Sequence, residues 1–155
     1  MNWNNRNLWP TLVSVVFAVV CFCFFQLFYP SHFYFKGQNQ LFLMSWSYIS
    51  TMFSKPAWTA CLAGEFLTQF YYLEVAGATI LTASLSILFW LTYQALNSLR
   101  LKRMNMWLSL TVALAVTVRE ASCHLFYGYT LSSTYALIGG LLMLDRKSTR
   151  LKSSH

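Results

Sequence analysis

The sequence predicts an all-α integral membrane protein with four transmembrane helices and one or two amphipathic helices between the first and second spans. Three observations support this prediction. Long apolar runs recur along the chain, basic residues gather beside the ends of those runs, and only 10% of the residues are charged. A typical soluble domain carries about 25% charged residues. A chain of 155 residues has no room for a large soluble core beside such runs, so the runs themselves form the architecture.

The first predicted span covers residues 11–29, which carry no charge and one glutamine, Gln26. A helix of this length is about 28 Å long and crosses a hydrocarbon core about 30 Å thick. A cleaved signal peptide is the alternative, but its apolar region would be about 7–15 residues long and would end in small residues. This run ends in bulky aromatic residues, which favours an uncleaved helix.

Residues 30–74 are punctuated by Pro30, Gly37 and Pro56 and predict helices that lie at the membrane surface. Residues 40–54 alternate polar and apolar sides at helical spacing, although Ser45 breaks the pattern. Fifteen residues are few for a span, so an interfacial helix is favoured. Residues 57–73 predict a second interfacial helix or a re-entrant one.

Three more spans are predicted, over residues 75–97, 104–121 and 126–144. Two of them carry small side chains at helical spacing, which lets neighbouring helices approach closely. These small-residue stripes are Thr79, Ala83 and Ser86 in one span and Ser132, Ala136 and Gly140 in the other.

The basic residues predict the orientation. Arg100, Lys102 and Arg103 crowd the short connection between the second and third spans, which the positive-inside rule places in the cytoplasm. The N-terminus, with Arg6, then also lies in the cytoplasm, and residues 30–74 lie outside. We therefore expect a multi-pass protein of the bacterial inner (plasma) membrane with a cytoplasmic N-terminus.

Residues 145–155, DRKSTRLKSSH, resemble the translation of a common sequencing-library adapter, DRKSTRLNSSH, from which they differ only at Lys152. On this interpretation they form a non-native tail, and residues 1–144 are an N-terminal fragment of a longer multi-pass domain. The lipid bilayer and the missing C-terminal spans of the same chain are then the expected partners. A genuine basic tail after the last span is the alternative.

Two groups of residues are candidates for chemistry. Glu65, Gln69 and Tyr72 share one face of a helix, and a carboxylate in an apolar segment beside the membrane suits acid–base or cation chemistry. Glu65 and Gln69 are the catalytic candidates. The alternative for Glu65 is a side chain that simply points to water.

The second group, Arg119, Glu120 and His124, supplies the binding candidates. Glu120 and His124 lie one helical turn apart and suit a proton-sensitive pair, and Arg119 suits an anionic lipid head group. The alternative is a polar helix end at the membrane surface.

No cofactor or metal site is expected, because the chain holds no P-loop, HExxH, GxSxG or CxxC motif. The adapter-like tail contributes +3 of the net charge of +7, and the remaining charge does not suggest nucleic-acid binding. Cys61 and Cys123 both fall on the oxidising side of the predicted topology, where a disulfide between them is an open alternative.

The segment KPAWTACLAGEFLTQFYYLEVAGATIL, residues 55–81, resembles the bacterial multi-pass membrane proteins of domain-of-unknown-function family 6057. The resemblance rests on GEFLTQFYY, followed by Ala76, Gly77 and Ala78. Such proteins often show a glycine-rich turn after the proline, where this chain has Ala57 and Trp58. The resemblance implies a longer chain with more spans, and it implies no activity and no catalytic residues.

The sequence alone therefore indicates a membrane protein of unknown biochemical role. Three functions compete beneath that description. The first is a membrane glycosyltransferase of the C-type fold that acts on lipid-linked sugars, with Glu65 as the base. The second is a transporter or flippase, and the third is an assembly subunit.

Overall fold

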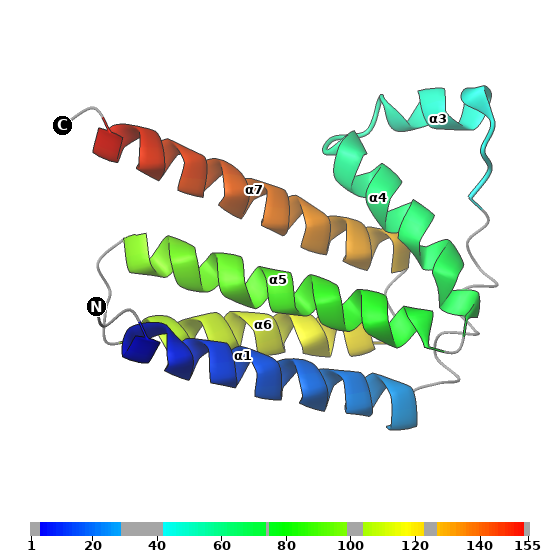
Figure 1. Cartoon of the computed structure of the whole chain (residues 1–155). Coiled ribbons are helices and arrows are strands. Elements are labelled where there is room, and N and C mark those ends of the chain that lie inside the picture. The colour runs from blue at the N-terminus through cyan, green and yellow to red at the C-terminus, as the bar shows by residue number, and fades with distance from the viewer. Residues whose placement is uncertain (1–3, 29–41, 74, 99–103, 123–126, 154–155) are drawn as a thin grey trace.

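Four long helices lie side by side, with α1 and α6 pointing one way and α5 and α7 pointing the other (Figure 1). A short helical pair, α3 and α4, packs at one end of them. The computed structural model describes residues 4–28, 42–73, 75–98, 104–122 and 127–153. It describes side chains over residues 8–28, 42–73, 75–97, 104–122 and 131–144. The prediction of an all-α fold is confirmed for this part of the chain.

Helix α1 covers Asn4–Cys23 and continues as a π-helical turn, η1, over Phe24–Phe28. It begins seven residues before the predicted span and contains Pro10, which is buried. Proline removes one backbone donor from the helix but does not end it here. The predicted span 11–29 therefore lies almost wholly within one continuous helical segment.

Helix α3 covers only Trp46–Met52, so the prediction of a helix over 40–54 is wrong in its extent. Ser45 is the reason at the N-terminal end. Its backbone is extended, and its side chain accepts a hydrogen bond from the backbone N–H of Tyr48, which makes it the N-cap. The residue that broke the apolar pattern is thus the residue that starts the helix.

The second predicted surface segment, 57–73, forms α4 over Trp58–Thr68 and a 3₁₀ turn, η2, over Gln69–Tyr72. Helix α4 packs most extensively on α7. The other predicted spans become α5 over Ala76–Ser98, α6 over Asn105–Ala121 and α7 over Tyr127–Ser153. Helix α7 continues beyond Leu144, where the predicted span ends.

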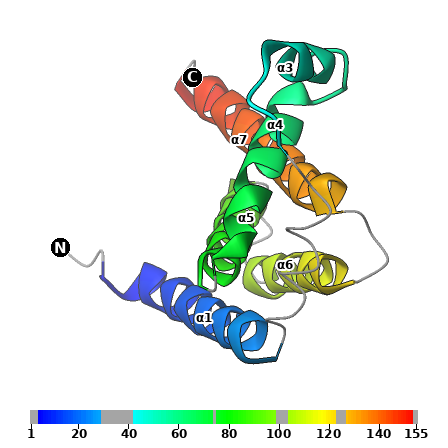
Figure 2. The same cartoon turned by 90° about the vertical axis from the view of Figure 1, so that its right-hand side faces the viewer.

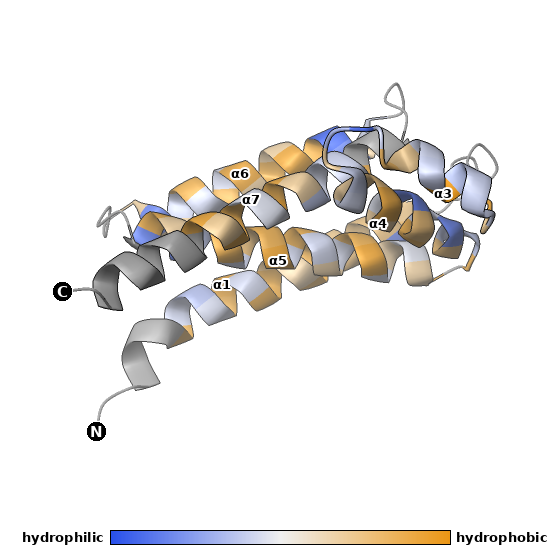
Figure 3. Cartoon of the chain, turned by 90° about the horizontal axis from the view of Figure 1, so that it is seen from above, coloured by the Kyte–Doolittle hydropathy of each residue, from blue (hydrophilic) through white to orange (hydrophobic). Residues whose placement is uncertain are grey.

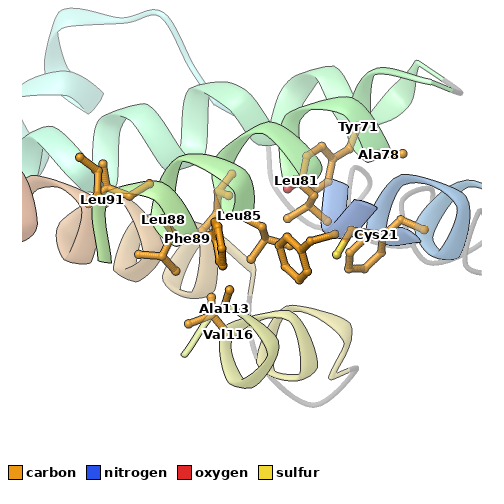
Figure 4. Packing of buried hydrophobic residues seen from close by; sticks show 14 residues of the cluster. Cys21, Tyr71, Ala78, Leu81, Leu85, Leu88, Phe89, Leu91, Ala113 and Val116 are labelled. Carbon is orange, nitrogen blue, oxygen red and sulfur yellow. The ribbon is translucent and has the colours of Figure 1, made fainter. Parts of the chain in front are cut away.

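Helix α5 lies between α1, α6 and α7 and contacts all three (Figure 2). Its buried face supplies six of the fourteen side chains of the apolar core, and four of them, Leu81, Leu85, Leu88 and Phe89, are each no more than 1% exposed. The ring of Phe89 stacks on that of Phe17 from α1 at 6.0 Å. Figure 4 shows Leu88 and Phe89 of α5 beside Ala113 and Val116 of α6, with Leu81 nearer to Tyr71.

Among the described residues, two helices have the length and hydropathy needed to cross a membrane, Leu8–Phe28 and Ala76–Asn97. The prediction of four spans meets that test for two. Helix α6 has 17 residues and ends in charged side chains, and the apolar part of α7, Leu131–Leu144, is also short. In Figure 3 the most hydrophilic segments lie toward the ends of the bundle, and apolar colour dominates its middle.

The small-residue stripes do not behave as predicted within the described bundle. Thr79 and Ala83 of α5 are exposed, and a Cβ on Gly140 of α7 would meet nothing within 4 Å. The close approach of two helices occurs instead where Gly64 of α4 crosses Ser132 of α7. Ser132 is the one stripe residue at this crossing because α4 covers only the first half of α7 (Figure 1).

Ala57, just before α4, has φ 55° and ψ 40°, the left-handed conformation that favours glycine. We expect Ala57→Gly to stabilise the fold by about 1 kcal/mol, because the Cβ that crowds this conformation is removed. Ala60→Gly, inside α4, is the matched control and should destabilise by about 1 kcal/mol. Equilibrium unfolding of both variants in detergent checks the opposite signs, and equal destabilisation by both would contradict the expectation.

Candidate functional site

Glu120 lies at the end of α6 and is fully buried, with 0% of its surface exposed. Its Oε1 accepts a hydrogen bond of 2.8 Å from the Thr134 hydroxyl of α7. The burial follows from helical periodicity, because the buried residues of α6 recur every three or four positions and form one straight stripe. That stripe consists of Asn105, Ser109, Ala113, Val116 and Glu120.

Two tyrosines lie close enough to this carboxylate for its charge to affect them. They are Tyr71 from η2 and Tyr135 from α7. Tyr71 is 1% exposed, and burial first and the Glu120 charge second raise its pKa well above the ordinary value. The Tyr135 hydroxyl lies 2.8 Å from the Ser84 Oγ. Because Ser84 donates to the Ile80 carbonyl, Tyr135 is the donor of that pair.

We call Glu120, Thr134, Tyr71, Tyr135 and Ser84 the buried polar cluster. Its members come from α5, α6, α7 and η2, so it ties together four elements that are distant in sequence. Figure 4 shows Tyr71 beside Ala78 and Leu81 at the start of α5, with the rest of the apolar core extending along that helix.

The predicted group of Arg119, Glu120 and His124 is only partly placed. Arg119 is exposed although its neighbour Glu120 is buried, since successive residues of a helix point about 100° apart. His124 lies outside the described residues. The interpretation of this group as a polar surface end therefore fits Arg119 and does not fit Glu120.

The predicted face of Glu65, Gln69 and Tyr72 is divided among different contacts. Glu65 Oε2 accepts a 2.6 Å hydrogen bond from the Tyr48 hydroxyl of α3, and Glu65 Oε1 lies 3.6 Å from the Lys55 ammonium. Gln69 donates its amide N–H to the Phe42 carbonyl at 2.9 Å, and Tyr72 is 77% exposed. Glu65 and Gln69 thus both hold the α3 segment against α4, and Tyr72 takes no part.

The Tyr48–Glu65 contact makes a prediction about alkaline pH. Desolvation, and then its bond to Glu65, raise the pKa of Tyr48 to about 12, whereas the pKa of a tyrosine in an unfolded chain is about 10. The contribution of this bond is therefore complete below pH 10 and is lost as the pH rises toward 12. We expect Tyr48→Phe to speed hydrogen exchange in α3 at neutral pH and to remove this alkaline dependence. Equal exchange rates in the two proteins at neutral pH would contradict the expectation.

Metal and disulfide chemistry find no support in the described residues. No group of three or more His, Cys, Asp or Glu side chains there is placed to hold a metal ion. Cys21, Cys23 and Cys61 carry free thiols, and Cys123, the proposed partner of Cys61, lies outside the described residues.

The family to which the chain belongs follows from a comparison with known families. Residues 5–151 match a family described as "Family of unknown function (DUF6057)", which is nearly the whole chain. The chain belongs to the DUF6057 family. The resemblance predicted from residues 55–81 is thereby confirmed and extends to all of the described helices. The DUF6057 match ends inside the adapter-like segment 145–155. No curated protein and no solved structure matches the chain.

Proposed function

We propose that this DUF6057 chain is a membrane-embedded helical domain in which α1, α5, α6 and α7 all cross the bacterial inner membrane. The exposed surface of α1 is the observation that carries this proposal. Five apolar side chains in the middle of α1 are each more than half exposed, which a lipid environment accommodates and water does not. They are Leu12, Val15, Val16, Val19 and Val20.

The arrangement of the helix ends supports a cytoplasmic N-terminus. Helix α1 begins, α5 ends, α6 begins and α7 ends at the same end of the bundle (Figure 1). The sequence around those ends carries Arg6 and the basic run at 100–103. Outside the adapter-like tail, this end of the bundle thus corresponds to four of the seven lysines and arginines, and three of them crowd into one short connection, as the positive-inside rule requires of a cytoplasmic face.

Reporter fusions test this topology directly. Alkaline phosphatase, which is active only outside the cytoplasm, should be active when fused after residue 39 or 124 and inactive after residue 101. A fluorescent protein that folds only in the cytoplasm should show the reverse pattern. Activity of the phosphatase fused after residue 101 would contradict the proposal.

Among the competing roles, transport of an ion or small solute is the one that the geometry supports best. Transport requires polar groups inside the bundle, and the buried polar cluster places a carboxylate there between α6 and α7. In liposomes loaded with a pH-sensitive dye, an imposed ion gradient should drive a proton flux that Glu120→Gln abolishes. A flux that Glu120→Gln leaves unchanged would remove this role.

Sugar transfer from a lipid-linked donor is the second candidate. It is favoured by the pairing of Glu65 with Lys55, an acid and a cation side by side at the end predicted to face outward. Lys55 would attract the donor phosphates, and Glu65 would act as the base. Full activity of Glu65→Gln on a lipid-linked donor would exclude it.

A role as an assembly subunit would require a surface on which other helices pack. The exposed Thr79 and Ala83 of α5 offer a small-residue face that further spans of the same protein would cover. Together with the lipid bilayer, those spans are the partners that we propose.

A further inference from the structure

The five side chains of the buried polar cluster, Glu120 included, offer one kind of chemistry. Apart from the carboxylate they are hydroxyls, from Thr134, Tyr71, Tyr135 and Ser84. Oxygen atoms are the ligands that hard cations take, and the carboxylate can instead accept a proton. The cluster is buried to 2% exposure or less at Glu120, Thr134, Tyr71 and Ser84, so a bound ion there would be shielded from bulk water.

The position of the cluster gives it a short route to water. Glu120 is one residue from the end of α6, and Tyr71 lies in the turn before α5 begins. Arg119, the residue before Glu120, is exposed, and a guanidinium at this place marks the level of the head groups or of water. The Glu120 carboxylate is therefore buried, but it lies within one helical turn of the exposed end of α6.

From this placement we infer that Glu120 is an exchange site for a monovalent cation, either a proton or Na⁺, on the outward-facing side of the bundle. The inference rests on the proposed transport role and names its ion. In the exchange, the protonated carboxyl releases H⁺ to water and its oxygens take up Na⁺, so the charge of the site is unchanged. Where Na⁺ does not bind, the proton alone leaves and returns.

Among the described side chains, the titratable groups whose pKa responds to the Glu120 charge are Tyr71 from η2 and Tyr135 from α7. Helix α5 contributes the Ser84 hydroxyl, which does not titrate in this range, and Arg119 of α6 is directed to the surface. Glu65 of α4 is engaged by Lys55 and Tyr48. The side chains of His124, Tyr127 and Tyr129 lie outside the described part.

Infrared difference spectroscopy on the full chain in lipid vesicles tests this inference. The carbonyl stretch of a protonated carboxyl is read while pH is stepped, first with choline chloride and then with sodium chloride as the salt. We expect a band that loses intensity as pH rises, that is absent from Glu120→Gln and that remains in Glu65→Gln. If the band loses further intensity when Na⁺ is added at constant pH, sodium is the second ion. If the intensity does not change on adding Na⁺, the proton is the ion that the site exchanges.

Thr134→Val tests whether the Thr134 hydroxyl contributes to ion binding, because a purely structural role would leave the Na⁺ and pH dependence of the band unchanged. If sodium is the ion, losing the hydroxyl should raise the Na⁺ concentration for half loss of the band by up to about tenfold. If the proton is the ion, the midpoint pH of the band should move in Thr134→Val and stay in Thr111→Val. A band that is insensitive to both pH and Na⁺, or that persists in Glu120→Gln, would overturn the inference.

The same samples separate this inference from the proposed function. Vesicle flotation reports whether the chain is embedded in the membrane, and the proton-flux assay reports transport. A responsive Glu120 band without any flux would preserve the exchange site and remove the transport role. Proton flux without a responsive Glu120 band would preserve the transport role and remove the exchange site.

Discussion

Gly64→Ala is expected to destabilise the fold by about 2 kcal/mol and to loosen α4 from α7. A Cβ at Gly64 would lie 2.5 Å from the Ser132 Oγ, 2.8 Å from its backbone nitrogen and 3.0 Å from its Cα. The hydroxyl can rotate away, but the backbone of α7 cannot, so one of the two helices must shift. Unfolding in a detergent titration, followed by tryptophan fluorescence, measures the loss.

Two further variants isolate the cause. Gly139→Ala is the matched control, because a Cβ there would meet nothing within 4 Å, and it should be neutral or slightly stabilising. Ser132→Gly combined with Gly64→Ala should restore only part of the lost stability, since the backbone contacts remain. Equal effects of Gly64→Ala and Gly139→Ala would show that α4 and α7 do not cross as described.

Thr134→Val carries the second largest expected effect, a destabilisation of about 2 kcal/mol. Valine matches the shape of threonine but removes the hydroxyl that donates to Glu120 Oε1 at 2.8 Å. Withdrawing a donor from a fully buried carboxylate costs about 1–3 kcal/mol, because no water replaces it. Equilibrium unfolding at neutral pH measures the change.

Thr111→Val on α6 is the control for this prediction. Thr111 is exposed, and its hydroxyl donates to the Leu108 carbonyl of its own helix. Its replacement should change stability by less than about 0.5 kcal/mol. Combining Thr134→Val with Glu120→Leu should cost less than the two single changes together, since both remove the same bond. Simple additivity would mean that the two residues do not interact.

The helices themselves could be predicted from the sequence because apolar runs specify where a chain must be helical. Residues 75–97 became α5 within one residue at each end for this reason. The short helix α3 was predicted too long, because an amphipathic pattern does not show where a cap begins the helix. Ser45 was visible as an interruption, and its capping role depends on the extended backbone that the structure adds.

The candidate site was only half predictable. Glu120 was selected, and its burial could have been deduced from the uncharged residues one, two and three turns before it on α6, which are Val116, Ala113 and Ser109. Its partners could not, because Thr134 and Tyr71 come from elements whose packing is decided by long-range contacts. The partners of Glu65 were missed for the same reason, since Tyr48 reaches it only after α3 folds back on α4.

The most direct test of the membrane assignment is a nitroxide scan along α1. Spin labels placed singly at Leu12, Val16, Val19 and Val20 would sample the face that is more than half exposed in the bundle. With the protein in vesicles, we predict frequent collisions with oxygen and few with a water-soluble nickel chelate at all four positions. Frequent collisions with the chelate along the whole face would place α1 in water and contradict the central claim.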